Sequence, residues 1–214
     1  PKLAAGEIVG TLAHTETTTA PTQENLACEL KKDLLNGSKV VVPDGDIANF
    51  AVVSAKDGNK IVLCLADLAA EGAEIKSENT LDPSRSHASI VFKNAKVEVL
   101  DSEVDGWTAL QEVLDRAAVL FSFEQLGGAE ACMNMAKEYA MGRFAFGRPI
   151  ASFQAIKHKI ADMYIAVELA RSNCYFGAWA LSTNAPELST AAATARVSAS
   201  QAFNECSKEN IQTH

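Results

Sequence analysis

Long apolar segments and basic residues are both scarce in this sequence. No stretch of about 18 apolar residues occurs, so we expect no helix that spans a membrane. Lys and Arg number 19 against 27 Asp and Glu, which gives a formal net charge of −8 and a pI near 5.0. Nucleic-acid binding needs a basic face, so this composition excludes nucleic acid as the main partner. An anionic ligand would have to be bound by arginines gathered locally.

Paired cysteines are also lacking. The sequence contains no CxxC pair and no spacing typical of a metal site, so we expect reduced thiols, a cytoplasmic protein and no metal ion. No zinc-binding, Ser/His/Asp or P-loop pattern occurs either. There is no initiator Met and no signal peptide, and we expect an internal segment truncated at both ends. The cysteines are Cys28, Cys64, Cys132, Cys174 and Cys206.

The first part of the chain, residues 1–104, carries short apolar runs typical of β-strands. Examples are VVVPDG, FAVVSA, KIVLCLADL and ASIVFKNAKVEVL, which are rich in Val and Ile. Turn signals such as KDGNK and LDPSRS separate these runs. Short strands with frequent turns predict an antiparallel β-sandwich or β-barrel domain.

Residues 105–214 change to helical spacing. Apolar residues recur at helical intervals from about residue 107 to 141, from 150 to 182, and from 189 onward. Gly147 is expected to end the first helix and Pro149 to precede the second, and such short connections favour an up-and-down bundle. We therefore predict an α+β multidomain fold, in which a β domain is followed by three helices of a bundle. The pair Gly127–Gly128 predicts a close approach by another helix or by a ligand.

The connection between the first two helices, MGRFAFGRPIASFQ, is rich in arginine and phenylalanine. Guanidinium groups suit phosphate, aromatic rings offer faces for a planar ligand, and the following helix N-terminus favours an anion. One interpretation is a phosphorylated aromatic ligand such as a dinucleotide. The other is that Arg143 and Arg148 are solvated while Phe144, Phe146 and Phe153 fill the end of the bundle.

The wider stretch EYAMGRFAFGRPIASFQAIKHKIADM resembles the signature of the acyl-CoA dehydrogenase family. That signature is Tyr-Ala-x-x-Arg-x-x-Phe-Gly-x-x-Ile-x-x-Phe-Gln, followed by a helix with Leu/Ile-Ala-Asp-Met. Upstream, PKLAAGEIVGTLAHTE and NGSKVVVPDGDIANFAVVSA resemble the family's entry into its β domain and its flavin-side turn. Downstream, ENIQTH resembles the family's Ile-Gln-x-His-Gly-Gly motif. The likeness covers nearly all of the chain and agrees with its division into two parts.

The resemblance implies a middle β domain, a C-terminal helical domain and an enzyme that uses FAD. Members of the family desaturate the α and β carbons of an acyl-CoA thioester, with a carboxylate base and hydride transfer to the flavin. The variants LDRA, VPDG and LDPSR are most similar to bacterial members that act on branched or steroid-derived acyl-CoA. The implied partners are electron-transfer flavoprotein, as the electron acceptor, and further subunits of a homo- or heteromeric dimer or tetramer whose FAD contacts cross the subunit interface.

The resemblance also implies which residues bind FAD. Two segments of the β domain would lie on either side of the flavin ring, and the Thr15 hydroxyl would bond to its pyrimidine edge. Arg143 would hold the pyrophosphate, and Gln212 would reach the cofactor of a neighbouring subunit. For His14, a role of the side chain and a role of the backbone amide alone are both open. The full set is Leu12, Ala13, His14, Thr15, Val41, Val42, Pro43, Arg143, Phe144, Ala145, Phe146, Phe153, Gln154 and Gln212.

The chain departs from the family pattern in several places. TETTTAPT replaces Thr-Glu-Pro-x-x-Gly-Ser-Asp, and VVP replaces Trp-x-Thr, so a stacking ring and a hydroxyl beside the flavin are missing. The arginine that meets CoA falls at Ala118, and Arg116 together with Asp115 is expected to bind the substrate instead. The family's catalytic glutamate would lie beyond His214, so the catalytic base is left unassigned.

Three functions follow from these likenesses and departures. The first, which we favour, is a flavin enzyme that desaturates acyl-CoA. The second is a non-catalytic or half-site partner subunit of a heteromeric acyl-CoA dehydrogenase, for which altered flavin loops would be suitable. The third is a flavin oxidase or monooxygenase of the same fold. A downstream glutamate would favour the first over the second, and rapid reaction of the reduced flavin with oxygen would favour the third.

Overall fold

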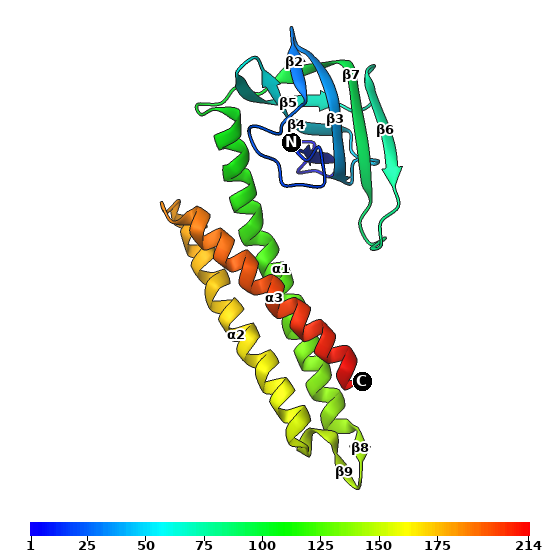
Figure 1. Ribbon diagram of the computed structural model, residues 1–214, viewed down its shortest axis with the longest axis vertical. Coiled ribbons are helices and arrows are strands. Elements are labelled where there is room, and N and C mark those ends of the chain that lie inside the picture. The colour runs from blue at the N-terminus through cyan, green and yellow to red at the C-terminus, as the bar shows by residue number, and fades with distance from the viewer. The chain divides into compact units, whose positions relative to one another are not determined.

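The computed structural model describes residues 1–214 and falls into two compact units, Pro1–Gln111 and Glu112–His214 (Figure 1). The first unit contains a seven-stranded sheet, and the rest of the chain is largely helical. A sheet region followed by three long helices agrees with the predicted α+β class. The boundary expected after residue 104 lies just before the first long helix, which begins at Gly106.

The pairings of the seven strands close on themselves. The strands are β1 (Gly10–Ala13), β2 (Glu29–Lys31), β3 (Leu34–Pro43), β4 (Phe50–Asp57), β5 (Lys60–Asp67), β6 (Ala73–Glu78) and β7 (His87–Val99). A circuit runs from β4 through β2, β3, β7 and β5 back to β4, while β1 also pairs with β4 and β6 with β7. Both β1 and β2 run parallel to β4, so the expectation of a purely antiparallel domain is wrong. Apolar alternation identifies strands but does not encode their direction.

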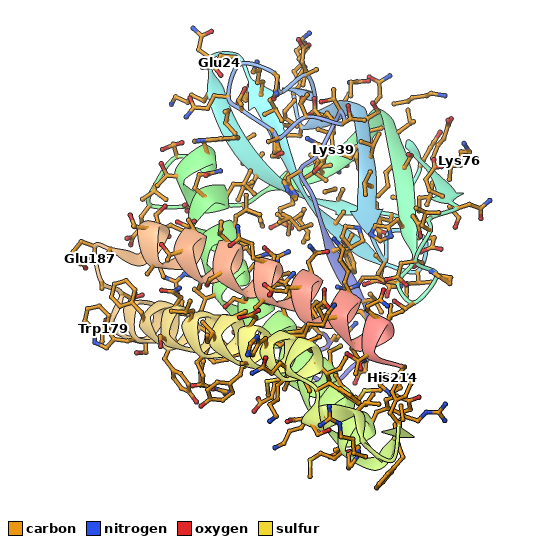
Figure 2. The ribbon with its side chains drawn as sticks, turned by 60° about the horizontal axis from the view of Figure 1, so that its bottom comes forward. Glu24, Lys39, Lys76, Trp179, Glu187 and His214 are labelled. Atoms are coloured by element: carbon orange, nitrogen blue, oxygen red, sulfur yellow. The ribbon has the colours of Figure 1, made fainter.

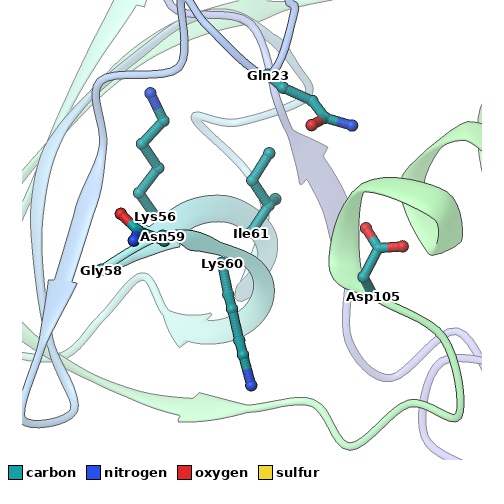
Figure 3. Close-up of a pocket in the computed structure, with 7 residues that line it drawn as sticks. All are labelled: Gln23, Lys56, Gly58, Asn59, Lys60, Ile61 and Asp105. Carbon is teal, nitrogen blue, oxygen red and sulfur yellow. The ribbon is translucent and has the colours of Figure 1, made fainter.

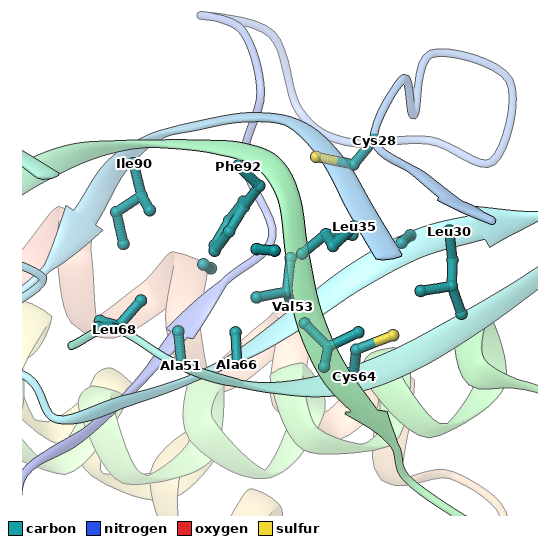
Figure 4. Close-up of a cluster of buried hydrophobic side chains, with 14 of the residues drawn as sticks. Cys28, Leu30, Leu35, Ala51, Val53, Cys64, Ala66, Leu68, Ile90 and Phe92 are labelled. Atoms are coloured by element: carbon teal, nitrogen blue, oxygen red, sulfur yellow. The ribbon is translucent and has the colours of Figure 1, made fainter. Parts of the chain in front are cut away.

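Alternating side chains of these strands meet in one apolar core. In β7, Ala88, Ile90 and Phe92 are buried while the residues between them are partly exposed. Leu35 of β3 and Val53 of β4 belong to the same cluster (Figure 4). This period of two is expected of strands that place one face on a core. All five cysteines of the chain are free.

One charged side chain lies fully buried in this unit. Lys39 of β3 places its Nζ 2.6 Å from Oε1 of Glu16 and 3.1 Å from Oγ of Ser54. Glu16 also accepts hydrogen bonds from the N–H groups of Ala27 (2.5 Å) and Cys28 (3.1 Å). Burial raises the pKa of Glu16, but Lys39 and the two amides outweigh it, and the pKa lies below the usual 4.5. Figure 2 shows Lys39 among the strands, whereas Lys76 extends from the edge.

Three long helices pack around a second apolar core. They are α1 (Gly106–Gly142), α2 (Gln154–Thr183) and α3 (Leu188–Thr213), in agreement with the predicted helices. Asn184 caps the end of α2, and its left-handed φ of 48° turns the chain toward α3. Gly177 of α2 leaves room for Ala195 of α3 and for Val119 of α1. Small residues of this kind allow helices to approach closely, so α2 and α3 lie side by side (Figure 1).

The connection between α1 and α2 differs from the prediction. α1 ends at Gly142, and a hairpin of β8 (Phe144–Ala145) and β9 (Arg148–Pro149) follows it. Phe146 and Gly147 form the two-residue turn, with φ of 52° and 77°. Two successive left-handed residues are typical of tight hairpin turns, so Gly147 is not a helix C-cap. α2 does not begin at residue 150 either, because a 3₁₀ turn, Ile150–Ser152, precedes it.

The glycine pair in α1 is explained at one of its two positions. A Cβ added to Gly128 would lie 2.8 Å from the ring of Phe203 on α3. A Cβ added to Gly127 would meet nothing within 4 Å. The predicted close approach by another helix therefore occurs at Gly128, and Gly127 lies beside open space.

Alanine at each glycine separates helix propensity from packing. Gly127→Ala is expected to raise the free energy of unfolding by up to ~1 kcal/mol, because Ala is the better helix former. Gly128→Ala has the same advantage but presses on Phe203, so it should be at least ~1 kcal/mol less stable than Gly127→Ala. Urea unfolding followed by circular dichroism measures both, and equal stabilities would contradict the packing described here.

The buried ion pair predicts a large effect of one truncation. Glu16→Ala leaves Lys39 buried without a counter-charge and is expected to lower the free energy of unfolding by about 3–5 kcal/mol. The control is Glu29→Ala, which breaks the exposed pair with Lys31 and should cost less than ~1 kcal/mol. If Glu16→Ala lowered the free energy of unfolding no more than Glu29→Ala does, the buried ion pair would not stabilise the fold.

The same ion pair predicts how stability depends on pH. The pKa of Glu16 is lower in the folded protein than its value of 4.5 without partners, so the folded state binds this proton more weakly. The stabilisation is therefore complete above 4.5 and is lost as the pH falls through the folded pKa. Acid titrations of unfolding should show a steeper loss for the wild type than for Glu16→Gln below pH 4.5.

Candidate functional site

Two segments of the first unit that the resemblance assigns to the flavin lie next to each other. They are Leu12–Thr15, at the end of β1, and Val41–Pro43, at the end of β3. The Thr11 hydroxyl donates a hydrogen bond of 2.6 Å to the carbonyl of Pro43. The N–H of Val40 donates another, of 2.8 Å, to the carbonyl of Thr15. Residues 32 and 25 positions apart in the sequence are thereby joined where β1 and β3 end.

The side chains of these segments divide between the core and the outer surface. Ala13 and Val42 are buried members of the apolar core. Leu12 and His14 flank Ala13 in the chain and are only partly buried, so they lie on the outer face. Val41 is 57% exposed. The side chains of Leu12, His14 and Val41 therefore reach the surface, whereas those of Ala13 and Val42 point into the core.

Val41 adopts a backbone conformation that its side chain disfavours. Its φ is 53°, in the left-handed region, and the pairing of β3 with β7 shifts register between Lys39 and Val42. A left-handed conformation costs an L-residue roughly 1–2 kcal/mol, and a β-branched residue there is a rare exception. Strain of this kind concentrates at functional sites. The bulge turns Val41 outward at the position where the family pattern has its tryptophan.

His14 carries an unsatisfied polar atom. Its Nδ1 is buried and has no hydrogen-bond partner. A buried polar group left unpaired costs about 1–3 kcal/mol. Burial lowers the pKa of His14, the nearby charge of Lys39 lowers it further, and the backbone of Leu12 opposes both. The imidazole is therefore neutral at neutral pH.

In the second unit, the hairpin between α1 and α2 presents arginines and aromatic rings to solvent. Phe146 is 96% exposed and Phe144 is also exposed, so these two rings do not fill the end of the bundle. The guanidinium of Arg148 lies 4.1 Å from the centroid of the Phe153 ring, a cation–π contact. Phe146 meets the same ring edge-on, at 6.2 Å between centroids. Arg143, at the base of the hairpin, is exposed.

Backbone hydrogen bonds hold Arg143 at the junction of helix and hairpin. Its N–H donates to the carbonyl of Tyr139 (2.8 Å), and its carbonyl accepts from the N–H of Ile150 (2.8 Å). The ion pairs of the second unit involve other residues, so its guanidinium donors remain available. Gln154 is exposed as the first residue of α2, and Ala145 is half-buried in β8. The hairpin thus gathers all of the predicted contacts from residues 143–154.

The end of α3 is tied to the end of α1. The ring of Tyr139 stacks on that of His214, with centroids 4.2 Å apart, and the Tyr139 hydroxyl lies 3.4 Å from the His214 carbonyl oxygen. Gln212 is exposed on the last turn of α3. Because Tyr139 lies one turn before Arg143, this stack brings the turn that carries Gln212 close to the base of the hairpin.

The residues expected to bind the substrate lie elsewhere in the second unit. Arg116, near the start of α1, donates a 3.2 Å hydrogen bond from Nη2 to Oδ1 of Asn184. Asp115 is half-buried beside it in the chain. At 1.5 Å per residue, Arg116 lies about 40 Å along α1 from Arg143. The structure therefore does not bring Asp115 and Arg116 together with the hairpin.

A polar cavity of the first unit contains none of the predicted site residues. Its volume is about 610 Å³, and Figure 3 shows the residues around it: Gln23, Lys56, Gly58, Asn59, Lys60, Ile61 and Asp105. The side chains of Lys56 and Lys60 extend in opposite directions (Figure 3), so they do not converge on one anion. No cluster of His, Cys, Asp and Glu suitable for a metal ion occurs in the chain. None of the helices has the length and apolarity needed to cross a membrane.

Sequence reasoning missed three features of these sites. The first is the strained backbone at Val41. Its only signal in the sequence is a valine at a position where the family pattern has a turn. The second is the stacking of Arg148 on Phe153, although their spacing across a short turn could have suggested it. The third is the contact of Tyr139 with His214, which lie in two different quoted motifs and have no shared signal in the sequence.

Comparison with known proteins identifies the family. The model of the acyl-CoA dehydrogenase C-terminal domain matches residues 104–214, just over half of the chain. Acyl-CoA dehydrogenase IpdE2 of Mycobacterium tuberculosis is 36% identical over 190 residues, which are 87% of this chain and 52% of that protein. Mitochondrial isovaleryl-CoA dehydrogenase of Arabidopsis thaliana is 32% identical over 191 residues, 82% and 46% of the two chains. The chain thus spans about half the length of the curated relatives it matches.

Solved structures agree in fold. Butyryl-CoA dehydrogenase of Megasphaera elsdenii superposes with a TM-score of 0.89 at 27% identity, over 99% of this chain and 59% of the other. A glutaryl-CoA dehydrogenase in complex with glutaryl-CoA gives a TM-score of 0.90 at 24% identity, over 100% of this chain and 57% of the other. Since the family model covers more than half of its residues and these relatives share its fold, the chain belongs to the acyl-CoA dehydrogenase family.

Proposed function

We propose that this chain forms the β-sheet unit and part of the helical unit of an FAD-dependent acyl-CoA dehydrogenase. The reaction would be the α,β-desaturation of an acyl-CoA thioester. The observation that carries this proposal is the joining of the two flavin-side segments by the Thr11–Pro43 and Val40–Thr15 hydrogen bonds. Family membership supports the reaction class and the cofactor, since acyl-CoA dehydrogenases depend on FAD and a structural neighbour is described in complex with FADH₂.

The residues of the first unit fit a flavin in two respects. The imidazole of His14 has a nitrogen without a partner, and Val41 is held outward in a strained conformation directly after Val40, whose N–H bonds to the Thr15 carbonyl. Leu12–Thr15 and Val41–Pro43 would hold the ring, with backbone groups of Ala13 and Val42 as donors and acceptors. Pro43 has no N–H, so it can only accept a hydrogen bond or make apolar contact. FAD, when bound, supplies the two-electron acceptor for the desaturation.

The hairpin of the second unit fits the phosphate-bearing part of the cofactor. The Arg143 guanidinium has donors free for a pyrophosphate, and arginine binds phosphate through a planar fork. Phe144, Ala145, Phe146, Phe153 and Gln154 would line the rest of the dinucleotide. We infer that the exposed tip, with Gln212, serves a neighbouring subunit of a dimer or tetramer, because a 96% exposed Phe146 is covered by nothing in its own chain.

Substrate and electron acceptor are proposed on weaker likeness. Arg116 and Asp115 would meet the CoA part of the substrate, and Arg116 is already held by Asn184. The names of the relatives, IpdE2 and isovaleryl-CoA dehydrogenase, favour a branched or steroid-derived acyl group. A neighbouring structure described as an electron-transferring flavoprotein of Acidaminococcus fermentans supports such a flavoprotein as the acceptor. No residue within this chain is assigned as the catalytic base.

We also infer that the closed circuit of strands forms a small barrel. Five strands paired in a ring around one apolar core leave no gap between two separate sheets. A barrel of this kind would hold the ends of β1 and β3 rigidly beside the cofactor.

The experiment that tests the proposed function is visible absorption of the full-length protein, purified alone and with any co-expressed homologue. A flavin band near ~450 nm that bleaches when acyl-CoA is added without oxygen is expected. Flavin that appears and bleaches only with the homologue would indicate a half-site subunit. Flavin that no acyl-CoA bleaches would overturn the dehydrogenase proposal and favour an oxidase or monooxygenase.

Arg143→Gln should weaken FAD binding. Loss of a charge-assisted hydrogen bond to phosphate costs roughly 1.5–3 kcal/mol, which is an increase in Kd of about 10- to 100-fold. Lys137→Gln is the matched control, because it removes an exposed positive charge near the end of α1, six residues before Arg143. Titration of the apoprotein with FAD, followed by flavin fluorescence, measures both. Equal weakening by the two variants would indicate a general effect of net charge.

Val41→Gly should relieve strain without breaking the fold. Glycine adopts a φ of 53° freely, so the free energy of unfolding is expected to stay unchanged or rise by up to ~1 kcal/mol. The adjacent Val40→Gly, at a position without positive φ, should lower it by about 1 kcal/mol. Thermal unfolding of the two variants measures this difference, and a loss at Val41 as large as that at Val40 would mean that no strain is stored there.

A further inference from the structure

Four buried polar side-chain atoms in this chain have no hydrogen-bond partner. They are Nδ1 of His14, Nδ1 of His87, Oγ of Ser152 and Oδ1 of Asn210. Buried polar atoms are nearly always paired in native proteins, so each such atom calls for an explanation. His14 is the one that lies between Ala13 and Thr15, in the segment joined to the end of β3. Its imidazole is therefore the polar group of the first unit best placed to meet a ligand at that edge.

The two ring nitrogens of His14 differ in their surroundings. Nδ1 is the buried and unpaired nitrogen, so Nε2 is the nitrogen that a ligand can reach. Burial and then the charge of Lys39 lower the pKa of the ring, against a smaller opposing effect of the Leu12 backbone, so the second proton is disfavoured. A neutral imidazole with its proton on the inward nitrogen has a free lone pair on Nε2.

The charges around the ring decide what His14 can contribute. Lys39 is fully buried and is held by Glu16, so its positive charge cannot move away when a ligand binds. A second positive charge on the imidazole next to it would be strongly disfavoured. His14 therefore acts as a hydrogen-bond acceptor and not as a cation. In this chain the residue before Thr-Glu is His14, and its side chain can accept such a bond.

We propose that Nε2 of His14 accepts a hydrogen bond from an N–H or O–H group of the bound flavin and thereby sets the affinity and the reduction potential of the cofactor. The proposal rests on the proposed function, since it needs FAD at the first unit. It assigns to the side chain a role that the backbone amide of residue 14 could not fulfil. His14 is in this sense a positioning residue for the flavin.

Three substitutions of His14 in the full-length protein test the assignment of the nitrogen. The amide of Gln reaches the position of Nε2, the shorter amide of Asn reaches that of Nδ1, and Leu keeps the volume without a polar atom. His14→Gln should bind FAD within about 2-fold of the wild type, whereas His14→Asn and His14→Leu should bind about 3- to 10-fold more weakly, the range for one hydrogen bond. Flavin fluorescence gives the affinity, and a spectroscopic redox titration gives the potential, which should shift in the same two variants only.

His87→Leu is the matched control. It removes the other buried, unpaired Nδ1 of the first unit, at the start of β7, where His87 lies opposite Pro43 in the strand register but is not itself a predicted flavin contact. This variant should leave the affinity and the potential unchanged, which excludes a general effect of filling a polar site.

The outcomes separate this inference from the proposed function. A wild-type protein that holds FAD while His14→Leu has the same affinity and potential would overturn the role of His14 alone. Wild-type behaviour of His14→Asn, with loss in His14→Gln, would overturn the assignment to Nε2. A wild-type protein that binds no FAD at all would overturn both proposals.

Discussion

The buried ammonium group of Lys39 is the constraint on which the first unit depends. A charge without water needs a partner at contact distance, and Glu16 is that partner. Glu16 is in turn oriented by the amides of Ala27 and Cys28, so the segment before β2, the end of β1 and the centre of β3 are held to one point. Thr15 and Val40 are the immediate neighbours of the two charged residues. The hydrogen bond between Val40 and Thr15 therefore joins the same two segments as the ion pair between Lys39 and Glu16.

The same charge determines the electrostatics of the candidate site. Burial is the larger cause of the lowered pKa of His14, and the charge of Lys39 lowers that pKa further. Lys39 also lies in β3 just before the bulge at which Val41 turns outward. A structural ion pair and a candidate ligand-binding edge are thus built from adjacent residues. A substitution that loosens the pair would change the edge as well, even where no ligand contact is removed.

The regular elements were predictable because their side chains repeat. Apolar spacing located α1 within a residue or two of Gly106–Gly142, and alternating runs located β4, β5 and β7. The direction of a strand and the order of strands in the sheet leave no periodic pattern in the sequence. The parallel pairing of β1 with β4 was therefore not predicted. The hairpin at Phe146–Gly147 was misread for a different reason. A glycine after a helix is the usual signal for a C-cap, and only the positive φ of the preceding Phe146 distinguishes a hairpin turn.

Motif likeness proposes the residues of the candidate site one by one, but it does not give their arrangement within each unit. Motif likeness pointed to Thr15, Val41 and Arg143 at positions far apart in the chain. The contacts that place them, such as those from Thr11 to Pro43 and from Tyr139 to His214, join residues that no local pattern relates. The unpaired nitrogen of His14 depends on burial, which alternation alone does not quantify.

The closed circuit of strands has a consequence for self-association. A sheet normally leaves two edges with unpaired backbone groups, and such edges invite pairing with other chains. Here the circuit removes most of that edge, and what remains is carried by β1, which is only four residues long, and by β6. β6 places Glu74, Lys76 and Glu78 in alternation along its exposed side. Charged side chains along an edge strand make pairing with a second copy less favourable, so little of this sheet is open to edge-to-edge association.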